Sequence, residues 1–280
     1  MHNKKIIIFF IFIFVYFESV FSQETRLFSI LKKKEIVVSV AKTYEPFYIE
    51  DPNEGFPGFD VDFAKKYAKF LDVNIKIIPL GDFEDQARAI VSGKVDIAVA
   101  GISSHLARAK EVNFSDPYLI TTPAGLVNKQ SLPPEPEGQI VVVKPFKDLL
   151  DLKFQSGISF SVKSDSSSYF FLKKNFENSK TYSYLSNNLS LDSLLRNNVN
   201  CFVADGLLIE ALLQKKPELK ANYLPLLNPV SEEHISVALP KNDVYLTQSM
   251  NFFIKEMKRN GNIKELKAKY FNNNGWVKKN

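Results

Sequence analysis

Residues 95–108 read VDIAVAGISSHLAR, and this stretch indicates how the chain is organised. Its first six residues are apolar apart from one aspartate, which is typical of a buried strand. Gly101 ends the strand, two serines stand where a helix would begin, and Arg108 falls one turn into that helix. Open α/β sheets bind ligands where strands end and helices begin, and a guanidinium can grip a carboxylate with two hydrogen bonds. The stretch therefore predicts an α/β fold with a carboxylate-binding arginine at the sheet edge.

Two more strands and two helices are predicted before this stretch. The strands are expected at residues 36–41 and 73–78, where β-branched residues are frequent. Between them, apolar residues recur at helical spacing from Asp60 onward, and Asp60 is placed to cap that helix. The second helix is predicted over residues 84–92, with Gly93 closing it. The order β-α-β-α-β predicts a parallel sheet with helices on its faces.

A second α/β unit follows an extended apolar segment and a proline-rich loop. The extended segment covers residues 118–129, and the loop, which we expect to be exposed, covers residues 131–138. Strands are predicted at residues 158–162 and 201–204, the latter ending at Asp205, with helices at residues 169–176, 191–195 and 207–214. A further extended segment at residues 234–240 precedes helices at residues 244–259 and 262–270.

Two α/β units joined by two extended crossings predict a two-lobed α/β protein. Each lobe would be an open, mostly parallel sheet flanked by helices, with a ligand cleft between the lobes that closes by a hinge motion. We assign residues 23–120 and 236–280 to a discontinuous lobe 1 and residues 121–235 to lobe 2.

The composition is that of a soluble globular protein. Apolar residues make up 45% of the 280 residues and charged residues 24%. The formal net charge of +5 is spread along the chain without a basic stripe, which argues against a nucleic-acid partner. We expect a monomer.

The N-terminus predicts export from the cytoplasm. Lys4 and Lys5 precede an apolar run at residues 6–17, and residues 20–22, VFS, have small residues at their first and third positions. This is the pattern of a secretory signal peptide, here residues 1–22, cleaved after about Ser22. The alternative is a membrane anchor, but twelve apolar residues are short of the ~20 that a spanning helix needs. Periplasmic location is therefore expected, and the single cysteine, Cys201, excludes an internal disulfide.

Catalytic and metal-binding patterns are sparse. Outside the expected signal peptide the sequence has two histidines, His105 and His234, and neither pairs with metal-ligand spacing. The sequence contains neither a G-x-S-x-G nucleophile motif nor a G-x-x-x-x-G-K phosphate loop. His105 stands near two serines, but consecutive helix positions do not face one another. We therefore expect no metal, no cofactor and no enzymatic activity.

Several short motifs together resemble one family. In chain order they are YEPF at 44–47, GFDVD at 58–62, GKVD at 93–96, AGI at 100–102, Arg108, FSDPY at 114–118 and the closing helix at 261–271. With these motifs the chain resembles the bacterial periplasmic amino-acid-binding proteins of ABC transporters, solute-binding protein family 3, over nearly the whole mature chain.

The resemblance implies ligand-binding roles for residues in both lobes. Arg108 would bind the ligand α-carboxylate with help from Ser103, and Asp205 would receive the α-ammonium. Tyr44 and Phe83 would sandwich the ligand, and the loop at residues 163–167 would contribute backbone N–H groups and selectivity. The expected ligand-binding residues are Tyr44, Phe83, Gly101, Ser103, Arg108, Lys163, Ser167 and Asp205.

Plainer roles remain open for these residues. Arg108 and Lys163 could be solvated surface cations, and Asp205 could simply cap a helix. The two aromatic residues could be part of the cleft rim or of a core.

The sequence also departs from the family pattern. Ala41 stands where the family often has an aspartate for the ligand ammonium, Asp165 adds negative charge to the loop of lobe 2, and the loop at residues 130–146 is long. A non-standard amino acid, or a carboxylate without an amine, would also fit this pattern.

The expected function is capture of a small carboxylate, foremost a polar amino acid, and its delivery to an ABC permease. Two alternatives stay open. One is a periplasmic enzyme on the same scaffold, resembling cyclohexadienyl dehydratase, with Asp165 as the candidate acid. The other is a ligand-sensing module that acts through a partner.

Overall fold

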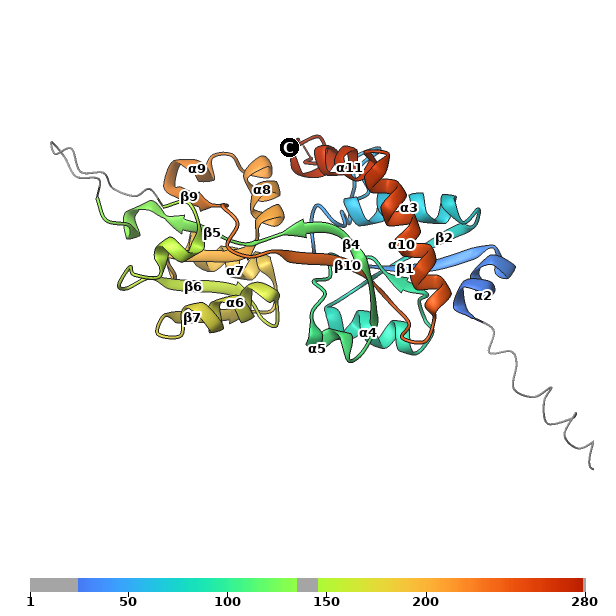
Figure 1. Cartoon of the computed structure of the whole chain (residues 1–280). Helices are drawn as coiled ribbons and strands as arrows, with labels where there is room; N and C mark the ends of the chain where they lie inside the picture. The colour runs from blue at the N-terminus through green and yellow to red at the C-terminus, as the bar shows by residue number, and fades with distance from the viewer. Residues whose placement is uncertain (1–24, 135–145, 279–280) are drawn as a thin grey trace, which may run out of the picture.

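The structure is a computed structural model that describes residues 25–134 and 146–278. The expected signal peptide lies outside these residues, as does the second half of the proline-rich loop at residues 131–138. Two five-stranded sheets, each with helices packed on it, form two lobes (Figure 1). The predicted two-lobed α/β fold is confirmed.

The sheet of lobe 1 has the strand order β2-β1-β3-β10-β4. These strands are β2 Asn74–Leu80, β1 Glu35–Ala41, β3 Ile97–Ala98, β10 Glu233–Leu239 and β4 Asn113–Thr121. β1 pairs in parallel with β2 and β3, whereas β10 runs antiparallel to both β3 and β4. The helices of this lobe are α2 Arg26–Lys33, α3 Phe59–Phe70, α4 Phe83–Val91, α5 Leu106–Ala109, α10 Val244–Arg259 and α11 Asn262–Phe271.

Lobe 2 repeats this arrangement with the strand order β7-β6-β8-β5-β9. Its strands are β7 Lys180–Tyr184, β6 Ser159–Lys163, β8 Cys201–Asp205, β5 Pro123–Asn128 and β9 Tyr223–Leu226. Its helices are α6 Ser167–Asn175, α7 Asn187–Leu195, α8 Gly206–Lys215 and α9 Leu219–Asn222, with the short 3₁₀ helices η1 Lys129–Ser131 and η2 Leu149–Leu152. In both lobes three strands are parallel and the two others run antiparallel to their neighbours.

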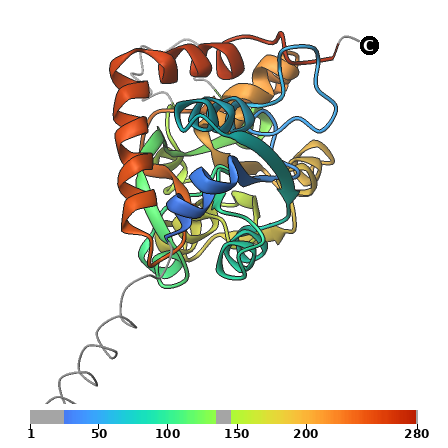
Figure 2. The same cartoon turned by 90° about the vertical axis from the view of Figure 1, so that its right-hand side faces the viewer.

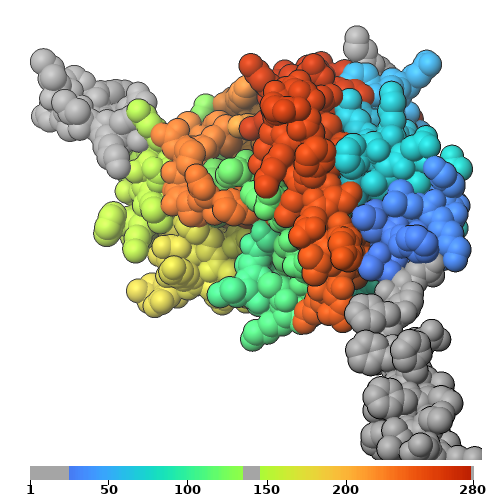
Figure 3. Space-filling view, turned by 45° about the vertical axis from the view of Figure 1, so that its right-hand side comes forward, coloured from blue at the N-terminus to red at the C-terminus, as the bar shows by residue number. Residues whose placement is uncertain are grey.

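The chain crosses between the lobes twice, and both crossings are extended. β4 leads directly into β5, and the segment after β9 returns through β10, which pairs with β4 (Figure 1). α10 and α11 run along two sides of lobe 1 (Figure 2) and form one continuous band on the face shown in Figure 3. α11 also packs against α8 of lobe 2, where Lys215 forms an ion pair with Glu45 of lobe 1.

The core of lobe 1 is rich in aromatic rings. Phe63 stacks on Tyr118 with ring centroids 4.8 Å apart, and Phe47 meets Phe271 edge-on at 5.3 Å. Ile36, Val38 and Val40 of β1 are buried and Val37 is half-buried, as expected of a parallel strand covered on both faces. Pairing of β1 with β2 and β3 places the end of β1 beside the ends of these strands.

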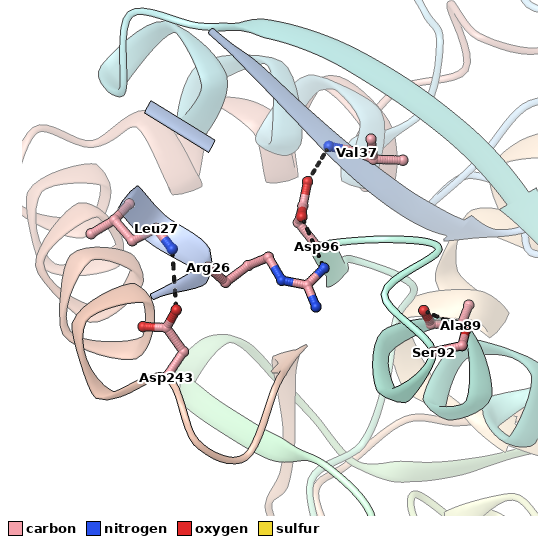
Figure 4. Close-up of polar contacts among 7 residues, drawn as sticks. All are labelled: Arg26, Leu27, Val37, Ala89, Ser92, Asp96 and Asp243. Carbon is pink, nitrogen blue, oxygen red and sulfur yellow. Dashed lines mark hydrogen bonds and ion pairs between the residues drawn. The ribbon is translucent and has the colours of Figure 1, made fainter. Parts of the chain in front are cut away.

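Asp96, the one polar residue in the predicted strand at 95–100, is structural. One of its carboxylate oxygens accepts the Val37 N–H at 2.7 Å, and the other lies 3.2 Å from Nη1 of Arg26 (Figure 4). The Leu27 N–H donates to Asp243 at 3.1 Å. These contacts attach α2 to the sheet and to the start of α10.

Two local predictions were wrong. Asp60 does not cap α3, because the cap position is Gly58 and Asp60 is fully buried within the helix, where it accepts a hydrogen bond from the Tyr118 hydroxyl at 2.8 Å. The serines before α5 do not begin a helix either. The Ser104 N–H donates to the His234 carbonyl at 2.9 Å and Ser103 bridges to Ile235, so this segment pairs with β10 instead.

Candidate functional site

A cleft of about 430 Å³ lies between the lobes, and all eight predicted ligand-binding residues line it. From lobe 1 come Tyr44, Phe83, Gly101, Ser103 and Arg108, and from lobe 2 come Lys163, Ser167 and Asp205. Ala41 and Asp165 line it as well.

The fold explains why these residues meet. β1 and β3 end at the cleft in lobe 1, and β6 and β8 end there in lobe 2. The helices that follow begin at the same edge: Ser166 caps α6 by accepting the Tyr169 N–H at 3.1 Å, and Asp205 caps α8 by accepting the Leu208 N–H at 2.9 Å. Ligands bind at this carboxyl edge in open α/β sheets.

Gly101 is required where it stands. Its φ of +56° is in the left-handed region, and a Cβ at this position would lie 2.5 Å from Cε1 of Tyr44. A glycine therefore lets the Tyr44 ring approach the backbone at the end of β3.

Tyr44 and Asp205 join the lobes. The Tyr44 hydroxyl donates a hydrogen bond to Asp205, which is 8% exposed. Burial raises the pKa of Asp205 to about 6, with a further rise caused by Glu233, while the hydrogen bond from Tyr44 lowers it. Burial and the neighbouring Asp205 raise the pKa of Tyr44 well above its usual value. Asp205 is thus both a helix cap and a cleft carboxylate.

Arg108 also spans the cleft. Its Nη1 donates to the Ser103 carbonyl at 3.1 Å in lobe 1, and its Nη2 donates to the Asp165 carbonyl at 3.3 Å in lobe 2. The guanidinium carbon lies 4.6 Å from the centroid of the Phe83 ring, which supports it from one side. Two of its five N–H groups are thereby used, and the other three have no acceptor among the described residues.

Lys163 ends β6 beside this arginine. Burial lowers the pKa of Lys163, and the charge of Arg108 lowers it further, against the effect of Asp82 and Glu84. The ammonium is half-buried and faces the cleft from lobe 2. It provides a second positive charge near Arg108.

Glu233 is a cleft residue that was not predicted from the sequence. It is the first residue of β10 and is 9% exposed. Its carboxylate accepts hydrogen bonds from Ser103 of lobe 1 and Ser167 of lobe 2. One feature of the sequence is consistent with this burial. In a strand that starts at Glu233, the side chain of Glu233 points to the same side as the apolar Ile235, and the exposed His234 points to the other side.

The cleft is predominantly acidic. Its lining includes two cationic side chains, Arg108 and Lys163, and six acidic ones. Asp205 and Glu233 are buried, whereas Asp82, Glu84, Asp85 and Asp165 are exposed, and Asp85 pairs with Arg88. Over residues 25–134 and 146–278, no group of histidine, cysteine and acidic side chains is arranged to hold a metal ion. The helices within the same ranges are all too short or too polar to cross a bilayer.

The fold and the sequence are similar to those of known proteins. The L-cystine-binding protein TcyJ of Escherichia coli (strain K12) is 24% identical over 251 residues, which cover 90% of this chain and 88% of that protein. A putative binding component of an ABC transporter from Wolinella succinogenes, solved in complex with lysine, superposes with a TM-score of 0.74 at 25% identity and covers 87% of this chain and 98% of that one.

An enzyme is also similar over part of the chain. The cyclohexadienyl dehydratase of Pseudomonas aeruginosa is 35% identical over 98 residues, which is 35% of this chain and 36% of the enzyme. The family model of the bacterial extracellular solute-binding proteins, family 3, matches residues 36–273. With two lobes, a cleft at the strand ends and a match over this whole length, the chain belongs to family 3 of the bacterial extracellular solute-binding proteins.

Proposed function

We propose that the protein captures an amino acid in the interlobe cleft outside the cytoplasm and delivers it to an ABC permease. The observation that carries this proposal is the convergence of Arg108 and Asp205 on one cleft from opposite lobes. A guanidinium with three unused N–H groups suits an α-carboxylate, and a buried carboxylate suits an α-ammonium. The relatives named for L-cystine binding and solved with lysine support this ligand class.

Capture would proceed by closure of the lobes. The ligand would dock on lobe 1 through Arg108 and the ring of Tyr44, and lobe 2 would then bring Asp205 and Lys163 against it. The contacts Tyr44–Asp205 and Arg108–Asp165 already join the lobes in this structure, and the two extended crossings provide the hinge. Closure excludes water, which strengthens each charged contact with the ligand.

A thermal-shift screen tests the proposal directly. The mature protein from Gln23 onward is heated with each of the twenty amino acids and with small carboxylates that lack an amine. A ligand that binds only the folded state raises the melting temperature. We expect a shift with at least one amino acid and none with the amine-free carboxylates. A shift with amine-free carboxylates alone would replace the amino-acid proposal with a carboxylate carrier.

A dehydratase activity is the second candidate, favoured by the 98-residue similarity to cyclohexadienyl dehydratase. Asp165 would be the proton donor, and it lines the cleft with an exposed side chain. Incubation with prephenate or arogenate and measurement of the aromatic product separates the candidates. Turnover that disappears in Asp165→Asn would establish the enzyme, and absence of product in the wild type would remove it.

A further inference from the structure

Glu233 occupies an unusual position at the junction of the two lobes. It begins the strand by which the chain returns to lobe 1, and its side chain enters the cleft between them. One carboxylate oxygen, Oε1, accepts hydrogen bonds from the hydroxyl groups of both Ser103 and Ser167. Among the described residues, the other oxygen, Oε2, is buried and has no hydrogen-bond partner.

A buried carboxylate oxygen without a partner is costly. Removing an ionised group from water requires a compensating charge or hydrogen bond, so such an atom in a cleft indicates a missing donor. Arg108 does not supply this donor, because the hydrogen bonds it forms go to the backbone carbonyls of Ser103 and Asp165. Asp205 adds to the cost of the missing donor, because it lies close enough to Glu233 for the charge of Glu233 to raise the pKa of Asp205.

The two serine hydroxyls are also occupied. Because they donate to Glu233, a ligand carboxylate in this cleft has Arg108 as its main partner and meets Glu233 as a like charge. The remaining lining carries five further carboxylates; Asp85 pairs with Arg88, which leaves four against Arg108 and Lys163. A cationic group on the ligand would relieve this imbalance and would supply a donor to the free oxygen of Glu233.

We infer that Glu233 is a specificity-determining residue which, beside Asp205, receives a cationic N–H group of the ligand and so selects a positively charged amino acid. The inference rests on the proposed function and adds the charge class of the ligand. It assigns the free oxygen Oε2 to the ligand and Oε1 to the two serines that orient the carboxylate.

The test compares three probes in the wild type and in Glu233→Gln. L-arginine and L-citrulline have nearly the same shape but differ in side-chain charge, and agmatine is arginine without its carboxylate. The glutamine amide oxygen can still accept the serine hydroxyls, so the variant removes the charge and keeps the shape. Calorimetry should show that the wild type prefers arginine to citrulline by about tenfold or more, and that Glu233→Gln reduces this ratio to about threefold or less.

Glu232→Gln is the matched control. It makes the same change of charge one residue away, on a side chain that is 75% exposed and lies 3.5 Å from His234. We expect the preference for arginine to stay within about twofold of the wild type in this control. An equal loss of preference in both variants would overturn the inference, because net charge alone would then explain the selection. An unchanged ratio in Glu233→Gln would overturn it as well.

If Glu233→Gln does not fold, the ligand affinities of the wild type alone still test the inference. Tighter binding of citrulline than of arginine contradicts the inference, even if the amino-acid function stands. Binding of none of the three probes contradicts it too, while a thermal shift with another amino acid would keep the proposed function. If no amino acid binds but agmatine does, and the binding is lost in Glu233→Gln, the proposed function fails and the assignment of Glu233 survives.

Discussion

The Tyr44 hydroxyl of lobe 1 donates a hydrogen bond to the Asp205 carboxylate that caps α8 in lobe 2. These two side chains line the ligand cleft and connect the two lobes, and one of them also caps α8. It also counteracts the effect of burial on Asp205, because a hydrogen bond to the ionised carboxylate lowers its pKa.

Ligand affinity should depend on pH through Asp205. Its pKa is raised to about 6, so the carboxylate is ionised and can hold an ammonium above pH 6, and it is increasingly protonated below. We expect the affinity for an amino acid to be constant from pH 7 to 8 and to fall by about tenfold at pH 5. Calorimetry over this range measures it. Asp205→Asn, whose amide oxygen can still cap α8, should bind weakly and without this pH dependence, and a persisting dependence would assign the titration to another group.

Tyr44→Phe should move the midpoint of that pH dependence upward. The substitution removes the hydrogen bond that lowers the pKa of Asp205, so the carboxylate becomes protonated at a higher pH. A lost ligand contact would reduce affinity equally at every pH, whereas the expected result is a shifted midpoint. Binding curves at half-unit pH steps distinguish the two results, and an unmoved midpoint would show that the hydrogen bond does not tune Asp205.

Arg108→Ala should remove most of the affinity for amino acids. Loss of one partner of a desolvated charge pair costs on the order of 2–5 kcal/mol of binding free energy. Arg108→Lys should recover only part of it, because an ammonium cannot bind a carboxylate with two parallel bonds and would lose the contact of the guanidinium with the Phe83 ring. Arg259→Ala, which removes an exposed ion pair on α10, is the control and should bind normally. Near-normal affinity in Arg108→Ala would exclude the arginine as the carboxylate partner.

Asp60 should make the folded protein less stable as the pH rises. Burial raises the pKa of Asp60 to about 7, whereas in the unfolded chain it is about 4. Between about pH 4 and pH 7 the folded state binds more protons at Asp60 than the unfolded chain does. The free energy of unfolding therefore falls with rising pH, by on the order of 1 kcal/mol per pH unit.

Asp60→Asn has no proton to lose at this position, so its stability relative to the wild type should increase from pH 5 to pH 8. Thermal unfolding across this range measures the difference, and Asp192→Asn on the exposed face of α7 provides the control. A constant difference between Asp60→Asn and the wild type would show that Asp60 does not titrate in this range.

The sequence allowed much of this site to be predicted, because the fold places strand ends together. Lys163 and Asp205 end strands, Ser103 and Arg108 come shortly after one, and a parallel sheet collects such residues at one edge. Glu233 could not be predicted as a cleft residue, because its contacts are with Ser103 and Ser167, which are 130 and 66 residues away in the sequence. These residues come together only when the two lobes pack against each other. The burial of Asp60 was not predicted for a related reason. Its position in the sequence fits a helix cap, but in the fold it is buried and accepts a hydrogen bond from Tyr118, which lies 58 residues away.

The strand order of lobe 1 has a consequence for the route by which the chain folds. β10 lies between β3 and β4, so the sheet of lobe 1 has a gap in its interior until residues 233–239 have been added. The five strands of lobe 2 all lie within residues 123–226, and that sheet can be completed earlier in synthesis. Because long-range strand pairing is slow, we expect lobe 2 to fold first and lobe 1 to remain incomplete until the last sixth of the chain, which begins with β10, has been made.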